Sequence, residues 1–188
     1  KNLLKKIYDV NKNIVLILVN GSTISLPWAH EHIPAIIEAW YPGQSGGKAI
    51  AEVLYGDYNP GGKLPMTFYN GINDLPPFDD YDVRNGRTYM YFEGEPLYPF
   101  GYGLSYTNFK IKNVRLNDTN FSKSDTLQIT FNIINTGLRH GSEVPQLYIE
   151  KNGIKKLKAF KRIFLNKDES LESSMKVAIK EFQSWDTN

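Results

Sequence analysis

The sequence predicts an α/β segment followed by an all-β segment, and the hydrophobic pattern supports this in two ways. In the N-terminal third, continuous apolar runs alternate with amphipathic stretches, which is typical of parallel strands covered by helices. From about Phe109 the apolar residues recur at every second position, as in antiparallel strands with one buried face. The 188 residues, 41% hydrophobic and 22% charged, suffice for one large or two small globular domains.

The α/β segment begins with an amphipathic helix over the first ten residues, where apolar side chains and lysines occupy opposite faces. Residues 14–19 predict a strand buried on both faces, and residues 20–22 predict the turn at its carboxyl end. A second buried strand is predicted over residues 35–40. A helix follows over residues 46–55, with Ser45 as its N-cap and Gly56 as its end.

Residues 70–104 have a different composition, with an acidic run, many tyrosines and frequent proline and glycine. An irregular segment of this length is typical of a functional loop or an interdomain connection. The aromatic residues from Tyr89 to Tyr106 could form a platform for sugar rings or an apolar strap between two domains. Proline and glycine interrupt the segment as in a tightly routed connector, which favours the strap.

The all-β segment is predicted from two stretches in which apolar and polar residues alternate. Their apolar members are Leu127, Ile129, Phe131 and Ile133, and then Leu171, Met175, Val177 and Ile179. With further strands near residues 110, 147–149 and 157–165, we expect about five strands in an antiparallel sandwich. A seven-strand sandwich would lack its last two strands, which would leave an open edge.

Composition excludes several functions. The chain has no cysteine, so it has neither disulfides nor thiolate metal ligands, and its net charge of +2 argues against a nucleic-acid or membrane partner. The glycine-rich residues 43–49 have the wrong spacing for a phosphate loop and are better explained by close helix–sheet packing. His30 and His32 stand two apart, cannot face one ion on a helix, and are expected to be solvated near Glu31. No metal or cofactor is therefore expected.

Carboxylates are the remaining candidates for catalysis, and none forms a recognisable pair. Asp79, Asp80 and Asp82 form one cluster, and Glu93 and Glu95 form another, but both lie in polar, turn-rich stretches typical of solvated surfaces. Glu38 lies inside an apolar strand, where a salt bridge at the strand end is favoured over catalysis. Spacing alone identifies no catalytic residue.

Five motifs in order along the chain resemble glycoside hydrolase family 3. They are residues 39–44 (AWYPGQ), 53–67 (VLYGDYNPGGKLPMT), 99–107 (PFGYGLSYT), 141–149 (GSEVPQLYI) and 157–162 (LKAFKR). Residues 86–92 (GRTYMYF) are most similar to the β-xylosidase and related β-glucosidase branch. The resemblance covers nearly the whole chain.

The resemblance implies a partial α/β sandwich over residues 1–69, a connector over 70–104, and an incomplete fibronectin type III-like β-sandwich over 105–188. It also implies that an N-terminal barrel domain, which the chain lacks, contacts this portion within the complete protein. The family's nucleophilic aspartate and acid/base glutamate lie upstream of the matching segments, so no catalytic residue is assigned here. The complete protein is expected to release terminal β-linked xylose or glucose from oligosaccharides or aryl glycosides with retention of configuration.

Three residues are candidates for substrate binding at the pocket rim. Arg87 and Tyr89 lie in the connector, and Trp40 is the last residue of a predicted strand, at the carboxyl end where ligands of open α/β sheets gather. Arg87 could donate hydrogen bonds to sugar hydroxyls or hold an acidic neighbour, and the second role is favoured.

The alternative for the whole chain is a non-catalytic carbohydrate-binding or adhesion module. A periplasmic or secreted location is favoured over a cytoplasmic one.

Overall fold

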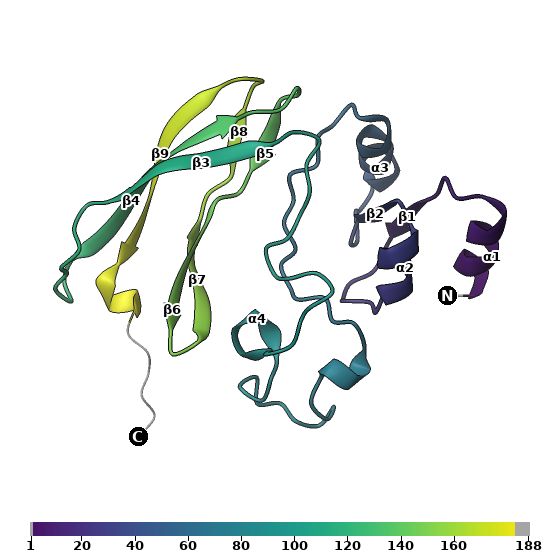
Figure 1. Cartoon of the computed structure of the whole chain (residues 1–188), viewed down its shortest axis with the longest axis horizontal. Coiled ribbons are helices and arrows are strands. Elements are labelled where there is room, and N and C mark those ends of the chain that lie inside the picture. Colours follow the sequence, from purple (N-terminus) through teal and green to yellow (C-terminus); the bar gives the residue numbers. More distant parts are fainter. Residues whose placement is uncertain (1, 183–188) are drawn as a thin grey trace. The chain divides into compact units, whose positions relative to one another are not determined.

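The chain folds into two compact units in a computed structural model that describes residues 2–182 (Figure 1). The first, the α/β unit, comprises the residues up to Tyr58 together with Leu64–Tyr102. The second, the β unit, comprises the short segment Asn59–Lys63 and the residues from Gly103 onward. Within residues 2–182, none of the helices combines the length and the apolar character that crossing a bilayer requires.

The α/β unit contains a two-stranded parallel sheet with helices before, between and after its strands. Its elements are α1 (Asn2–Val10), β1 (Val15–Leu18), α2 (Pro27–His32), β2 (Ala35–Glu38), α3 (Gly46–Tyr55), the 3-10 turn η1 (Ile72–Asp74) and α4 (Thr88–Tyr91). The strands pair from Val15 opposite Ala35 to Leu18 opposite Glu38. The two predicted strands and the helices predicted over 1–10 and 46–55 are therefore confirmed, whereas α2 was not predicted.

The ends of α3 agree only in part with expectation. Gly56 ends the helix in the left-handed conformation, with a φ of 80°, which a residue without a Cβ adopts at little cost. The predicted cap at the other end is wrong, because the Ser45 side chain makes no capping hydrogen bond. Its backbone carbonyl accepts the Ala49 amide instead, so the helix starts on main-chain contacts alone.

The burial predicted for the parallel strands is also wrong. Val15 is 44% exposed and Val19 is 57% exposed, and Gly46 is the one buried residue of α3. A strand is covered on both faces only when other elements pack on each side of its sheet. The described elements of the α/β unit do not cover this two-stranded sheet, so its apolar side chains remain accessible.

The irregular part of the α/β unit is folded by backbone pairing. Phe68 and Tyr98 form an antiparallel bridge, with the Phe68 amide donating to the Tyr98 carbonyl at 2.9 Å. Leu64 donates to Tyr102, and Gly101 donates back to Leu64, each at 2.8 Å. The segment thus returns alongside the residues that follow α3, which anchors the loops between them.

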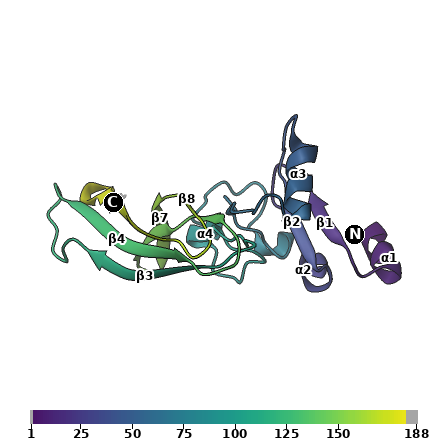
Figure 2. The same ribbon diagram turned by 90° about the horizontal axis from the view of Figure 1, so that it is seen from above.

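The β unit contains seven strands among its described residues, not the five expected. They are β3 (Phe109–Leu116), β4 (Thr126–Asn135), β5 (Gly141–Glu143), β6 (Gln146–Lys151), β7 (Ile154–Phe160), β8 (Ile163–Leu165) and β9 (Ser170–Ala178). The higher count arises because β5 and β8 have three residues each, too few to display a period, and because residues 157–165 span two strands. All pairings in this unit are antiparallel: β3-β4-β9, β5-β8 and the hairpin β6-β7 (Figures 1 and 2).

One hydrophobic core holds the β unit together. Its buried members are Ile129, Phe131, Ile133, Ile163, Leu165 and Met175. Leu147 of β6 and Ala159 of β7 pack against them, so the hairpin contributes to the same core as β4 and β9. The predicted face of β4 is confirmed, and Met175 and Val177 of β9 are buried as expected, but Leu171 near the start of β9 is 43% exposed.

Polar contacts tie the segment Asn59–Lys63 to the rest of the β unit. The buried Asn59 donates through Nδ2 to the His140 carbonyl at 2.8 Å and accepts the Tyr106 amide at 2.7 Å. Lys63 forms an ion pair with Glu143 at 2.9 Å and donates to the Gly103 carbonyl at 3.0 Å. The partly buried ion pair and the buried amide together fix how the chain enters and leaves this unit.

Candidate functional site

The carboxyl ends of β1 and β2 bring Asn20, Glu38 and Trp40 together. The Glu38 carboxylate accepts the backbone amide of Trp40 at 2.9 Å and the Nδ2 group of Asn20 at 3.2 Å. The salt bridge predicted for Glu38 is therefore replaced by contacts with neutral donors. These two bonds hold the loops that follow the two strands next to each other.

Two features of this edge are unusual for a purely structural turn. Trp40 has a φ of 52°, a conformation that costs a residue with a side chain about 1 kcal/mol or more. The Oδ1 atom of Asn20 is buried without a hydrogen-bond partner. The loops are also in close contact, since a Cβ added at Gly21 would lie 2.5 Å from the ring of Tyr41.

Arg87 binds backbone carbonyls rather than acidic side chains. Its guanidinium donates to the Asp80 carbonyl at 3.0 Å and 2.7 Å and to the Pro77 carbonyl at 2.9 Å. The favoured expectation that it holds an acidic neighbour is thus wrong at the level of atoms, because the Asp80 main chain is the acceptor. A guanidinium has five donors in a fixed plane, which suits it to clamp two turns of a loop at once.

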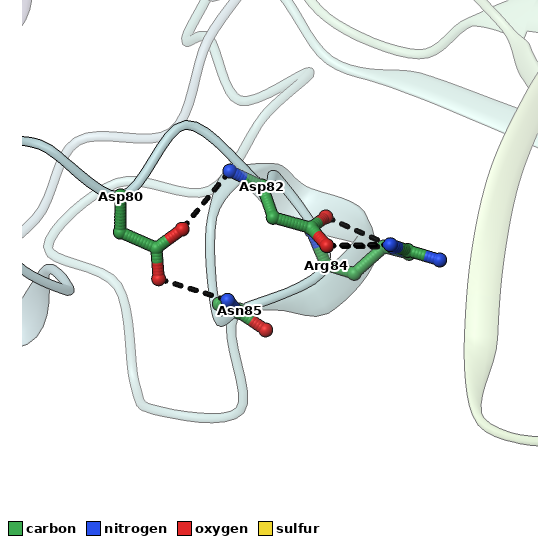
Figure 3. A network of polar contacts seen from close by, with 4 residues as sticks. All are labelled: Asp80, Asp82, Arg84 and Asn85. Atoms are coloured by element: carbon green, nitrogen blue, oxygen red, sulfur yellow. Dashed lines mark hydrogen bonds and ion pairs between the residues drawn. The ribbon is translucent and has the colours of Figure 1, made fainter.

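The acidic run folds the same loop from within (Figure 3). Arg84 binds both carboxylate oxygens of Asp82 at 2.6–3.0 Å, and Asp80 accepts the Asp82 amide at 3.0 Å and the Asn85 side chain at 2.8 Å. The hydrogen bonds from Arg84 lower the pKa of Asp82 to about 2. The acidic run is accessible to solvent as expected, and the carboxylates of Asp80 and Asp82 in addition organise the loop.

Tyr89 lies against an aromatic neighbour. Its ring is stacked on Phe100, with centroids 4.2 Å apart and planes 17° from parallel. The preceding Thr88 has a φ of 63°, and its amide donates to the Tyr69 hydroxyl at 2.9 Å. The strained residue and the stacked ring fix the start of α4.

A second aromatic group contains Trp40. The ring centroids of Trp40 and Phe68 are 6.2 Å apart, and those of Phe68 and Tyr98 are 6.1 Å apart. Phe68 itself is 2% exposed. Tyr98 stacks on Tyr102 at 5.4 Å, and burial together with this neighbour raises the pKa of the Tyr98 phenol. These rings pack on one another within the α/β unit, which argues against an open sugar platform, whereas the strap between two domains stays a prediction.

The histidines do not converge on a common point. The His30 Nδ1 atom lies 2.9 Å from the Tyr98 hydroxyl, whereas His32 stacks on Trp28 at 4.6 Å. The prediction of a solvated pair near Glu31 holds in part: His30 is exposed and His32 lies 3.9 Å from the Glu31 carboxylate, but each ring also contacts an aromatic neighbour. In the described part of the chain, no group of three or more histidine, aspartate or glutamate residues could hold a metal ion.

The three predicted rim residues thus all lie in the α/β unit, and each contacts a different neighbour. Trp40 packs on Phe68, Tyr89 stacks on Phe100, and Arg87 clamps the loop before α4. Sequence reasoning placed Asn20 in the turn after an apolar run but did not foresee its hydrogen bond to Glu38 or the burial of its Oδ1 atom.

The chain combines a parallel sheet, an aromatic connector and an antiparallel β unit. Its residues 1–106 match the model of the glycosyl hydrolase family 3 C-terminal domain. The chain belongs to this family.

Curated relatives agree along almost the whole chain. It is 39% identical to a xylan 1,4-beta-xylosidase of Xylanibacter ruminicola over 99% of its own length and 22% of that protein. It is 34% identical to a periplasmic beta-glucosidase of Salmonella typhimurium over 98% of its length and 26% of that protein. The chain therefore spans about a quarter of the length of the curated relatives it matches.

Solved structures support the same assignment. Beta-glucosidase 3B from Thermotoga neapolitana superposes with a TM-score of 0.84 at 30% identity, over 99% of this chain and 29% of that one. The beta-D-glucoside glucohydrolase from Trichoderma reesei gives a TM-score of 0.88 at 25% identity, over 99% and 31%. The relatives are glycosidases, and the arrangement of elements described above is the one they share.

Proposed function

We propose that the chain is the C-terminal portion of a retaining β-glycosidase that releases terminal xylose or glucose from oligosaccharides and aryl glycosides. In this proposal the chain supplies scaffold and part of the pocket rim, and the reacting carboxylates lie elsewhere in the complete protein. The observation that carries it is the family match over residues 1–106, joined to relatives named as β-xylosidases and β-glucosidases.

Three of the described carboxylates are poorly suited to serve as the glycosidase acid. A glycosidase acid needs a carboxyl group with a raised pKa. Hydrogen bonds lower the pKa of Asp82, and backbone amides of Asn120 and Thr119 lower the pKa of Asp118. Glu38 is engaged by the Trp40 amide and the Asn20 side chain.

The chemistry proposed for the complete protein is a double displacement. One carboxylate attacks the anomeric carbon while a carboxylic acid protonates the departing glycosidic oxygen, and the bond between them breaks. Water then attacks the glycosyl–enzyme ester, and the second group, now a carboxylate, accepts its proton. The sugar leaves with its original anomeric configuration.

We propose the same domain boundaries as the sequence resemblance implies. Residues 1–69 are assigned to the later part of an α/β sandwich, 70–104 to the connector and 105–188 to a fibronectin type III-like domain. The seven strands of the β unit remove the strand deficit for which this domain was expected to be incomplete. The shared core of β4, β9 and the β6–β7 hairpin supports a two-layered β domain. The exposed apolar side chains of β1 and α1 support a contact with a preceding barrel domain.

A periplasmic or secreted location is proposed because the Salmonella relative is named periplasmic.

Aryl β-xyloside and aryl β-glucoside hydrolysis by the full-length gene product and by residues 1–188 alone tests the proposal. We expect release of the chromophore by the former and none by the latter, and proton NMR of the first sugar released should give the β-anomer. Turnover by residues 1–188 that a substitution within them abolishes would overturn it, as would an α-anomer or an inactive full-length product.

The rim role is tested by W40A in the full-length product, with W28A as the matched control on α2. We expect W40A to raise KM several-fold with little change in kcat, since a rim contact binds ground and transition states alike. Equal effects of both variants would contradict the assignment.

A further inference from the structure

A shallow, open cleft in the α/β unit is lined by none of the three rim candidates. Its volume is about 450 Å³, and it is lined by the end of η1, the loop before α4, the last residue of α4 and the turn that follows. This volume falls in the range of about 300–1,000 Å³ typical of sites for small ligands. It is therefore large enough for a pyranose ring with its hydroxyl groups.

The lining combines aromatic surface with hydrogen-bonding groups of both kinds. Tyr91 and Phe92 supply rings, Asp74 and Glu93 supply acceptors, and Arg84 and Asn85 carry donors. Sugar hydroxyls both donate and accept, and the C–H faces of a pyranose are apolar. A wall that presents rings beside carboxylate, amide and guanidinium groups matches that chemistry on both counts.

Several of these side chains are already held in place. Arg84 is bound by both oxygens of Asp82, and Asn85 donates to Asp80 at 2.8 Å, as Figure 3 shows. The ring of Phe92 packs edge-on against Tyr69 at 4.9 Å. The Asp74 carboxylate accepts the Asn70 amide at 2.9 Å. A site whose groups are ordered before binding loses less entropy when a ligand arrives.

The charges of the lining argue for a neutral ligand. Asp74 and Glu93 bring two negative charges, and the one positive charge, on Arg84, is paired with Asp82 outside the lining. A phosphate or carboxylate ligand would be repelled, and no group of three acidic or histidine side chains among residues 2–182 offers a cation site. An uncharged polyhydroxyl compound meets neither objection.

We propose that this cleft binds one pyranose ring of a β-linked oligosaccharide, as a binding site without catalytic residues. The choice of xylose- and glucose-based probes rests on the proposed function, whereas the site itself rests on the cleft and its lining. The site would hold an oligosaccharide on the α/β unit while its terminal sugar is processed elsewhere.

The test is a titration of residues 1–188 with xylotetraose and cellotetraose, followed by amide NMR shifts and calorimetry. We expect saturable binding with a dissociation constant of about 1 mM, and shifts concentrated in residues 74–94. E93Q keeps the shape of an exposed side chain and should weaken binding about tenfold, and Y91A should weaken it at least about fivefold. The matched controls E95Q and Y81A, outside the lining, should bind as the unmodified chain does.

Absence of saturable binding by the unmodified chain would overturn the proposal. Equal weakening by the lining variants and their controls would also overturn it, and so would binding that E93Q and Y91A both leave unchanged. Amide spectra of each variant identify any that fails to fold, and E93Q then decides the question, because it removes a charge without removing volume. The binding assay involves no hydrolysis, so this proposal and the proposed glycosidase function can fail separately.

Discussion

Asn135 is expected to be the most sensitive polar position of the β unit. The residue is 0% exposed, and its side chain makes four hydrogen bonds. Its Oδ1 accepts from the Thr107 hydroxyl at 2.7 Å and the Gly137 amide at 3.1 Å. Its Nδ2 donates to the carbonyls of Arg139 at 2.7 Å and Leu165 at 3.3 Å. One amide thus joins the end of β4, the turn after it, β8 and the segment before β3.

The N135A variant leaves these partners without a bond in a buried site. An unsatisfied buried donor or acceptor costs about 1–3 kcal/mol, and water can reach the Arg139 carbonyl because that residue is exposed. The other three groups, the Thr107 hydroxyl, the Gly137 amide and the Leu165 carbonyl, stay buried without a partner. With partial relaxation they give an expected loss of about 3–5 kcal/mol in the free energy of unfolding. T107V removes one of the four bonds and should cost about 1–2 kcal/mol.

Urea unfolding followed by circular dichroism measures both losses. With a slope of about 2 kcal/mol per molar urea, N135A should lower the midpoint by about 2 M, or prevent folding outright. The control is N132A on the same strand, whose side chain alternates to the other face and should cost less than about 1 kcal/mol. If N135A and N132A shift the midpoint equally, the buried amide does not have the role assigned to it.

A charge at the same position adds a pH dependence of known sign. N135D places a carboxylate oxygen where an amide donated to the carbonyls of Arg139 and Leu165, so burial should raise the carboxyl pKa in the folded state. Its unfolded state then loses the proton first, and stability falls as pH rises above the ordinary carboxyl value. The deficit of N135D should therefore shrink in acid. A deficit that stays constant with pH would refute the reasoning.

Three further predictions concern the loop before α4 and the packing of the backbone. NMR of the Asp82 carboxyl carbon should give a pKa of about 2, and R84Q should raise that pKa. The stabilising contact with Arg84 should be fully present above the ordinary carboxyl pKa and should be lost as pH falls through about 2. R87K, which cannot bridge two carbonyls with one planar fork, should speed amide exchange in residues 77–85 while leaving the global unfolding midpoint nearly unchanged. G103A should destabilise the β unit by about 1–3 kcal/mol, because the new Cβ would lie 2.1 Å from the Gly62 carbonyl oxygen, whereas G47A on α3 meets no atom within 4 Å and should be neutral or stabilising in the same urea assay.

Local patterns were sufficient to predict the elements that depend on local chemistry. The period of two over β4 identified Ile129, Phe131 and Ile133 as one face, and their burial of 8%, 2% and 0% agrees. Gly56 was predicted as the end of α3 because a left-handed residue there requires no other partner. By contrast, β5 and β8 are defined by pairing with each other, and three residues contain no periodic signal.

Polar anchors were predicted less well, because their partners are distant in sequence. The role of Asn135 could not be predicted from its local sequence, because its partners include Thr107 and Leu165, which are 28 and 30 residues away. Arg87 was expected to hold a side chain, but it binds main-chain carbonyls, which every residue carries and no pattern marks. Composition can predict that a buried amide or guanidinium needs partners, but it cannot say which ones.

The exposed apolar face of the α/β unit follows from a different limit of sequence reasoning. A hydrophobic pattern records what a segment buries in the complete protein, whereas the observed exposure records only what the chain itself can cover. On α1 the pattern requires a covered face, yet Leu3 is 72% exposed and Val10 is 86% exposed. The same disagreement occurs at Val15 and Val19 around β1, while in the β unit pattern and burial agree along β4. The mismatch at α1 and β1 makes these elements one place where the proposed preceding domain would contact the chain.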